Sequence, residues 1–132
     1  MPTPIEVVTR FCDACGGGDV SALGAFFAED AVYHNIPMDP VTGRDGILTT
    51  LAAMTTGVDE VEFEVLQMAQ AAGGTEHSGI VLTERIDRFV FTTHTIALPV
   101  MGTFEVVDGQ ITAWRDYFDL DQFMTQLAPP AE

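Results

Sequence analysis

Three charged side chains occupy positions of this sequence where apolar residues are expected. Arg85 and Asp87 alternate with apolar residues in the run 78–91, and Asp116 lies between aromatic residues in the run 110–118. Alternate residues of a strand share one face, so these groups would be buried among apolar neighbours. A buried charge is unfavourable unless it is paired. The pattern therefore indicates one guanidinium and two carboxyls in a common buried site.

Two carboxyls near one arginine could divide the work of an acid and a base. Burial favours retention of one proton, and the coupled pair would titrate in separated steps. One carboxyl would then donate a proton while the other accepts one. The same three residues could equally form a structural ion triad, because such networks also perturb ionisation. The residue types alone leave both interpretations open.

A third run, 31–36, places Tyr33 and Asn35 on one face, and both side chains can hold a water molecule. Each also has a structural interpretation: Tyr33 as a core residue, and Asn35 as a turn former before Pro37. Trp114 is a core residue by default. If the three faces line one concavity, its polar groups suit proton transfer on a neutral substrate.

The elements that would position these side chains are helices followed by a long meander of strands. The sequence predicts helices from Pro4 to about Cys15, after Asp19, from Asp45 to near Gly57 and over 119–127. It predicts strands over 31–36, 60–69, 78–91, 94–107 and 110–118. A turn-rich loop is expected over 37–43, and a frayed tail at Pro129-Pro130. Hairpin signals at 71–74 and 108–109 make the sheet at least partly antiparallel. Alternation in 110–118 puts Ile111 on the face opposite Trp114. The order predicts a single α+β domain over residues 1–132, with helices against one side of a curved sheet.

Composition excludes several classes of partner. The 132 residues include 20 acidic and 5 basic side chains, which gives a net charge of −15. All five basic residues are scattered arginines, so we expect no nucleic-acid partner. No apolar run approaches the roughly 20 residues that span a bilayer, and residues 1–8 lack a secretory signal. We therefore expect no membrane insertion and a cytoplasmic location.

Cysteines and histidines do not form a metal or redox motif. Cys12 and Cys15 have a C-x-x-C spacing inside a predicted helix, without the further ligands or the preceding strand that such motifs need. The histidines at 34, 77 and 94 share no motif. We interpret the two thiols as core and helix-surface groups, and expect no metal site.

Several short segments occur in order along nearly the whole chain: YHNIP at 33–37, GRD at 43–45, TERID at 83–87 and WRDYFD at 114–119. In this order and spacing they resemble the limonene-1,2-epoxide hydrolase family. The resemblance implies the NTF2-like cone shared with ketosteroid isomerase, in which helices and a strongly curved, mostly antiparallel sheet enclose a deep apolar pocket. It also implies a homodimer and no metal or other cofactor.

Carried over residue by residue, the resemblance implies that Asp116 is the general base on a water held by Tyr33 and Asn35. Asp87 would be the general acid that donates to the epoxide oxygen, and Arg85 would bridge the two carboxyls. Water would attack a small apolar epoxide directly and give a vicinal diol, without a covalent intermediate.

The remaining expectations concern the pocket and the other functions that the fold supports. Trp114 flanks the catalytic positions of the family and is assigned to substrate binding, where it would shape the pocket or orient a polar group. Apolar residues that could line the pocket, but that more often fill a core, are Met38, Leu48, Leu51, Met54, Leu66, Met68 and Met101. The alternatives are an isomerase, cyclase or dehydratase acting on a polyketide- or steroid-like substrate, and a non-catalytic module that binds apolar ligands.

Overall fold

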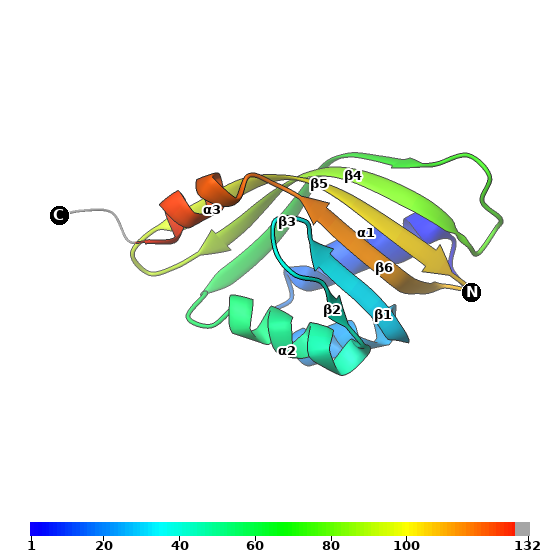
Figure 1. Cartoon of the computed structure of the whole chain (residues 1–132), viewed down its shortest axis with the longest axis horizontal. Coiled ribbons are helices and arrows are strands. Elements are labelled where there is room, and N and C mark those ends of the chain that lie inside the picture. The colour runs from blue at the N-terminus through cyan, green and yellow to red at the C-terminus, as the bar shows by residue number, and fades with distance from the viewer. Residues whose placement is uncertain (129–132) are drawn as a thin grey trace.

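The structure is a computed structural model that describes residues 1–128, with three α-helices, one 3-10 helix and six strands in this part of the chain (Figure 1). In chain order they are α1 (Pro4–Cys15), η1 (Val20–Phe26), β1 (Phe27–Asn35), β2 (Val41–Thr42), α2 (Arg44–Met54), β3 (Glu60–Gln70), β4 (Gly79–Val90), β5 (Thr95–Val107), β6 (Gln110–Tyr117) and α3 (Leu120–Leu127). The predicted α+β class is confirmed. The tail prediction at Pro129-Pro130 lies outside the described residues.

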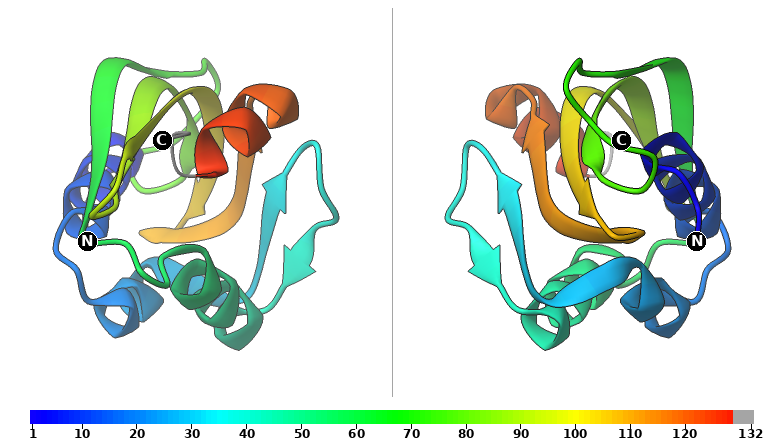
Figure 2. Two further views of the ribbon diagram at one scale, coloured as in Figure 1. Left: turned by 90° about the vertical axis from the view of Figure 1, so that its left-hand side faces the viewer. Right: turned by 90° about the vertical axis from the view of Figure 1, so that its right-hand side faces the viewer.

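The six strands form one mixed sheet in the order β2-β1-β6-β5-β4-β3. Only β1 and β6 run parallel, and all other neighbours are antiparallel. Figure 2 shows how strongly the sheet curves, with α2 lying against the side formed by β1 and β2. The parallel register sets Asn35 directly beside Asp116, so the crossover brings two distant segments of the chain to one place.

Helix α1 closes the concave side of the sheet. Its start is fixed by a reciprocal capping box, in which the Glu6 amide donates to Thr3 Oγ1 over 3.3 Å and the Thr3 amide donates to Glu6 Oε1 over 3.1 Å. The buried face of the helix, which includes Val8 and Phe11, packs toward β3, β4 and β5. No helix within residues 1–128 is long and apolar enough to cross a membrane.

An aromatic cluster around Trp114 forms the floor of the cone. The Trp114 ring stacks on Tyr33 with centroids 4.1 Å apart and on Phe104 at 5.5 Å, and Phe11 of α1 meets it edge-on at 5.0 Å. Aromatic pairs at these separations add to the stabilisation from buried area. This packing holds the side chains of β1 and β6 in fixed positions next to the catalytic candidates.

Three local features differ from the sequence prediction. The loop over 37–43 contains the short strand β2, which pairs with β1 and satisfies backbone groups at that edge, and β1 itself begins at Phe27 rather than at residue 31. Ile111 is buried in the same cluster as Trp114 rather than on the opposite face. The reason is a bulge: Glu105 pairs with Ala113 and Val106 with Ile111, which leaves Thr112 as an extra residue.

Candidate active site

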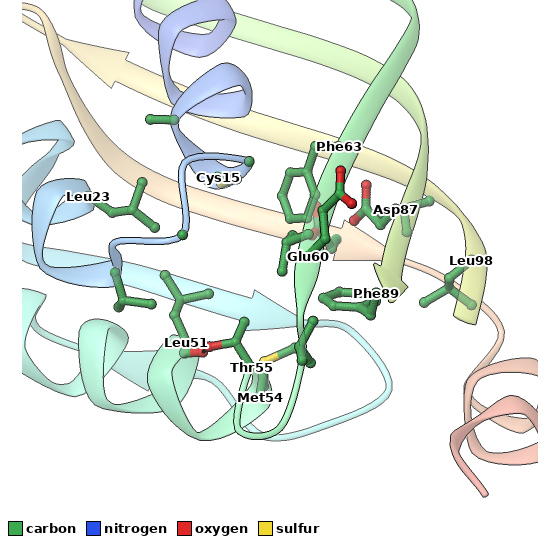
Figure 3. A pocket seen from close by; sticks show the side chains of 18 of the residues that line it. Cys15, Leu23, Leu51, Met54, Thr55, Glu60, Phe63, Asp87, Phe89 and Leu98 are labelled. Atoms are coloured by element: carbon green, nitrogen blue, oxygen red, sulfur yellow. Dashed lines mark hydrogen bonds between the residues drawn. The ribbon is translucent and has the colours of Figure 1, made fainter. Parts of the chain in front are cut away.

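A cavity of about 320 Å³ opens within the cone. Its wall combines the concave face of the sheet with the C-terminal ends of α1 and α2 and the start of β3 (Figure 3). Tyr33, Asn35, Asp87 and Asp116 reach it as polar groups in the depth of the cone. Most of the remaining wall is apolar, and its members from the sheet, from α3 and from the connection between β6 and α3 include Phe63, Phe89, Leu98, Val100, Phe118 and Phe123.

Arg85 joins the two carboxyls at the inner end of the cavity. Its Nε and Nη2 donate to Asp87 Oδ1 and Oδ2, each over 2.9 Å, and Nη2 also donates to Asp116 Oδ2 over 2.9 Å. The exposed fractions are 0% for Arg85, 4% for Asp87 and 3% for Asp116. Such a buried triad tolerates its charges only because each member is paired, and removal of one partner would leave an unpaired buried charge.

Neighbouring groups fix the guanidinium in place. Arg85 Nη1 donates to Thr83 Oγ1 over 3.0 Å, and the Thr83 hydroxyl donates to the backbone oxygen of Gly102 over 3.3 Å. The guanidinium carbon lies 4.8 Å from the centroid of the Phe63 ring and 5.8 Å from that of Phe104. A side chain at Gly102 would occupy the same space, because its Cβ would overlap Arg85 Nη1.

A second set of hydrogen-bonded side chains lies beside Asp116. The Trp114 indole nitrogen donates to Asp116 Oδ1 over 2.7 Å, and the Tyr33 hydroxyl donates to Asn35 Oδ1 over 3.1 Å. Among the described residues, no side chain or backbone group accepts a hydrogen bond from the Asn35 amide nitrogen, and Asn35 lines the cavity. A water in the cavity could therefore accept from Asn35 and donate to Asp116.

Burial controls the ionisation of the triad. It raises the pKa of Asp87 from its usual value to about 6, against the opposing effect of the Arg85 hydrogen bonds and charge. Burial also raises the pKa of Asp116, while Arg85 and the Trp114 hydrogen bond oppose the change. Burial alone would lower the pKa of Arg85, but the two carboxyls hold it well above its usual value. The guanidinium stays charged, and Asp87 can exchange a proton near neutral pH.

The structure thus brings the five predicted catalytic residues together: Tyr33, Asn35, Arg85, Asp87 and Asp116. The arrangement can perform paired acid and base chemistry on a ligand in the cavity. Their individual roles stay predictions. The sixth residue, Trp114, is completely buried and lies behind Asp116 rather than on the cavity wall.

Several residues of the site were not singled out from the sequence. Alternation puts Thr83 on the face of Arg85 and Asp87, but its residue type alone assigns it no role, and nothing in the alternation pattern marks Gly102. A glycine inside a strand is the one usable signal, because it often marks a close approach. Among the seven apolar candidates, Met38, Leu51 and Met54 line the cavity, whereas Leu48, Leu66, Met68 and Met101 do not.

The two thiols of α1 are not joined by a disulfide. Both cysteines are free, with Cys12 buried and Cys15 half-buried on the cavity wall. Burial raises the pKa of Cys12 to about 12, which makes it a poor nucleophile. Within residues 1–128, no group of three or more His, Cys, Asp and Glu side chains could hold a metal ion.

Comparison with known proteins assigns this chain to an enzyme family. The model of the limonene-1,2-epoxide hydrolase catalytic domain matches residues 2–129, so the chain belongs to this family. It is 35% identical to "Epoxide hydrolase EphG" of Mycobacterium tuberculosis over 113 residues, which cover 86% of this chain and 71% of the relative. It is also 31% identical to a steroid Δ-isomerase of Nocardioides simplex, over 84% of this chain and 85% of that relative.

Solved structures agree with this assignment. A structure described as an M. tuberculosis LEH-like epoxide hydrolase superposes with a TM-score of 0.69 at 31% identity, covering 93% of this chain and 87% of the other. Ketosteroid isomerase-like and SnoaL-like proteins reach TM-scores of 0.79 at 24% and 19% identity, and this likeness establishes the fold alone. The expected NTF2-like cone is confirmed.

Proposed function

We propose that the protein hydrolyses a small apolar epoxide to a vicinal diol by direct attack of water, with Asp116 as general base and Asp87 as general acid. The observation that carries the proposal is the Arg85 bridge, which holds two buried carboxyls 2.9 Å from one guanidinium at an apolar cavity. Family membership supports epoxide hydrolysis in general. The division of roles follows from the neighbours of each carboxyl.

Asp116 is the better candidate for the base because the water-holding groups are beside it. Its register partner on β1 is Asn35, whose side chain is joined to Tyr33. Asp87 instead lies in register between Phe63 and Leu98, both on the apolar wall that a substrate would contact (Figure 3). With its pKa raised to about 6, Asp87 is partly protonated near neutral pH and can donate.

The proposed step balances without any other reactant. The water oxygen bonds to an epoxide carbon while one water proton moves to Asp116. The bond from that carbon to the epoxide oxygen breaks, and this oxygen takes the proton of Asp87. Afterwards Asp116 is protonated and Asp87 is ionised. Transfer of one proton from Asp116 to Asp87 through solvent restores the starting state, while Arg85 stays charged throughout.

The cavity favours a compact substrate. Its volume of about 320 Å³ is at the lower end of the range of small-molecule sites, roughly 300 to 1,000 Å³. The apolar wall would desolvate the hydrocarbon part of an epoxide and orient its oxygen toward Asp87. We therefore expect terpene and aryl epoxides to be better substrates than long lipid epoxides.

The test measures diol formation from terpene, aryl and lipid epoxides by the parent protein and by Asp87→Asn and Asp116→Asn, with the exposed Asp30→Asn as a matched control. We expect both site variants to lose about 10²-fold or more of the parent rate, while the control retains it. A single turnover in ¹⁸O-water should label the diol and not the protein. A folded parent that hydrolyses none of the epoxides would overturn the proposal.

A second candidate is proton transfer on a steroid-like ketone, which is supported by the relative named a steroid Δ-isomerase. Either carboxyl could move a proton between two carbons of such a substrate. The Tyr33 and Asn35 pair favours hydrolysis instead, since an isomerase needs no positioned water. An unsaturated ketosteroid added to the same assay distinguishes the two reactions. A cavity that binds apolar ligands without turnover would indicate the binding module.

Two further expectations stay predictions. The homodimer implied by the family resemblance and the cytoplasmic location expected from the sequence would both be tested directly, by light scattering of the purified protein and by fractionation of the source cells.

A further inference from the structure

All charged side chains that line the cavity are acidic. In addition to Asp87 and Asp116 in its depth, the exposed carboxylates of Asp19, Asp59 and Glu60 lie at its mouth. Hydrogen bonds from Ser21 lower the pKa of Asp19 and keep it ionised. Within residues 1–128, none of the ion pairs involves these three mouth residues.

The arginines offer no free cation to the cavity, because each is already bonded to other groups of the protein and the sequence has no lysine. Their partners are Glu6 for Arg10, the Phe27 carbonyl for Arg44, Asp87 and Asp116 for Arg85, Glu62 and Glu64 for Arg88, and Glu105 for Arg115. No arginine lines the cavity in the part of the chain that the structure describes. A substrate carboxylate would therefore meet no cation there.

The helices add to the negative electrostatic potential of the cavity. The cavity is lined by the last residues of α1, including Ala14 and Cys15, and by the last residues of α2, including Met54. The C-terminal end of a helix carries a partial negative charge. The two helices that begin near the cavity offer no free positive end, because the carboxylates of Asp19 and Asp119 cap η1 and α3.

We propose that the mouth of the cavity selects epoxides by charge, favouring a cationic group at the end of the substrate remote from the epoxide, then a neutral group, and rejecting a carboxylate. This inference rests on the proposed epoxide hydrolysis for the reacting end of the substrate. The remote end lies at the mouth, where Asp19, Asp59 and Glu60 face solvent. The substrate class is thus an apolar epoxide that carries an ammonium group or no charge.

A binding measurement tests the charge selection without any turnover. Octylammonium, octanamide and octanoate share one chain length and differ in charge at pH 7.5, and calorimetry gives their dissociation constants for the parent protein. We expect octanoate to bind roughly five- to tenfold more weakly than octanamide at low ionic strength, and octylammonium more tightly. In about 0.5 M salt the differences should shrink, because exposed charges are screened.

Variants locate the effect at the mouth. The triple variant Asp19→Asn, Asp59→Asn, Glu60→Gln should reduce the octanamide-to-octanoate ratio toward one. The matched control Glu29→Gln, Asp30→Asn, Glu76→Gln removes the same total charge from exposed positions that do not line the cavity. The control should keep the parent ratio.

Turnover extends the test to the reacting ligand. The probes are 7,8-epoxyoctanoate, its methyl ester and 7,8-epoxyoctyltrimethylammonium, whose kcat/KM should follow the same charge order. Equal binding of octanoate and octanamide, or a ratio that the mouth variant leaves unchanged, would overturn the inference. If the binding order holds and no epoxide is hydrolysed, the charge selection stands and the proposed hydrolase function fails.

Discussion

The indole nitrogen of Trp114 and Asp116 Oδ1 are joined by a 2.7 Å hydrogen bond, while Arg85 Nη2 contacts the other oxygen of the same carboxyl at 2.9 Å. Both hydrogen bonds stabilise the carboxylate and oppose the effect of burial on its pKa. They also fix the orientation of the carboxyl. We therefore propose that Trp114 positions the proposed base rather than contacting the substrate.

We expect Trp114→Phe to raise the pKa of Asp116 further, because the carboxylate loses a donor. A base with a higher pKa is protonated at higher pH, so the acidic limb of the kcat/KM profile should move to higher pH. Phe27→Leu is the matched control, since the Phe27 ring also stacks on Trp114, at 6.3 Å, but donates no hydrogen bond to Asp116. An equal shift in both variants would attribute the effect to packing.

The raised pKa of Asp87, about 6, predicts a carboxyl that titrates near neutral pH. Carbon NMR of labelled aspartate should show such a signal, and this signal should be absent in Asp87→Asn. Because the pKa in the folded protein is above the unfolded value, this group stabilises the fold at low pH, and its contribution is lost as the pH rises from about 4 to about 6. The proposed acid also loses its proton above about pH 6, so kcat/KM should fall there. The absence of any aspartate that titrates above pH 5 would contradict the assignment.

The polar residues of the site could be predicted from the sequence because successive side chains of a strand point to opposite faces. Arg85 and Asp87 on one strand, and Tyr33 and Asn35 on another, needed only a period of two to be placed on shared faces. Ile111 was misplaced because a bulge at Thr112 shifts the period, and nothing local marks that bulge. The roles of Thr83 and Gly102 depend on how β4 and β5 pair, which is a tertiary relationship. The residues of the cavity wall could not be predicted for the same reason, because α2 and β5 contribute to it only through tertiary packing.

The hydroxyl of Thr83 accepts from Arg85 Nη1 over 3.0 Å and donates to the backbone oxygen of Gly102 over 3.3 Å, so Thr83→Val removes both hydrogen bonds. Valine has nearly the same shape but leaves a buried guanidinium donor unsatisfied, so the free energy of unfolding should fall by about 1–3 kcal/mol. Thr83→Ser keeps the hydroxyl and should lose about 1 kcal/mol or less, from the missing methyl group. Urea denaturation of the three proteins measures both values. Equal destabilisation would show that packing, not the two hydrogen bonds of the hydroxyl, dominates at this position.

At Gly102, the addition of a single methyl group should strongly destabilise the protein. A Cβ there would overlap Arg85 Nη1 and lie 2.7 Å from Asp116 Oδ1 and 2.9 Å from Thr83 Oγ1. Because the guanidinium is held on all sides, Gly102→Ala must displace the bridge between the two carboxyls. We expect a loss of about 1–3 kcal/mol in the free energy of unfolding, together with loss of diol formation. The matched control is Gly46→Ala in α2, whose Cβ would meet only Val41 Cγ1, at 3.2 Å and away from the triad, and whose helix would gain up to about 1 kcal/mol. A fully stable and active Gly102→Ala protein would mean that the carboxyls do not need Arg85 in its observed place, and the proposed acid and base pair would then need a different support.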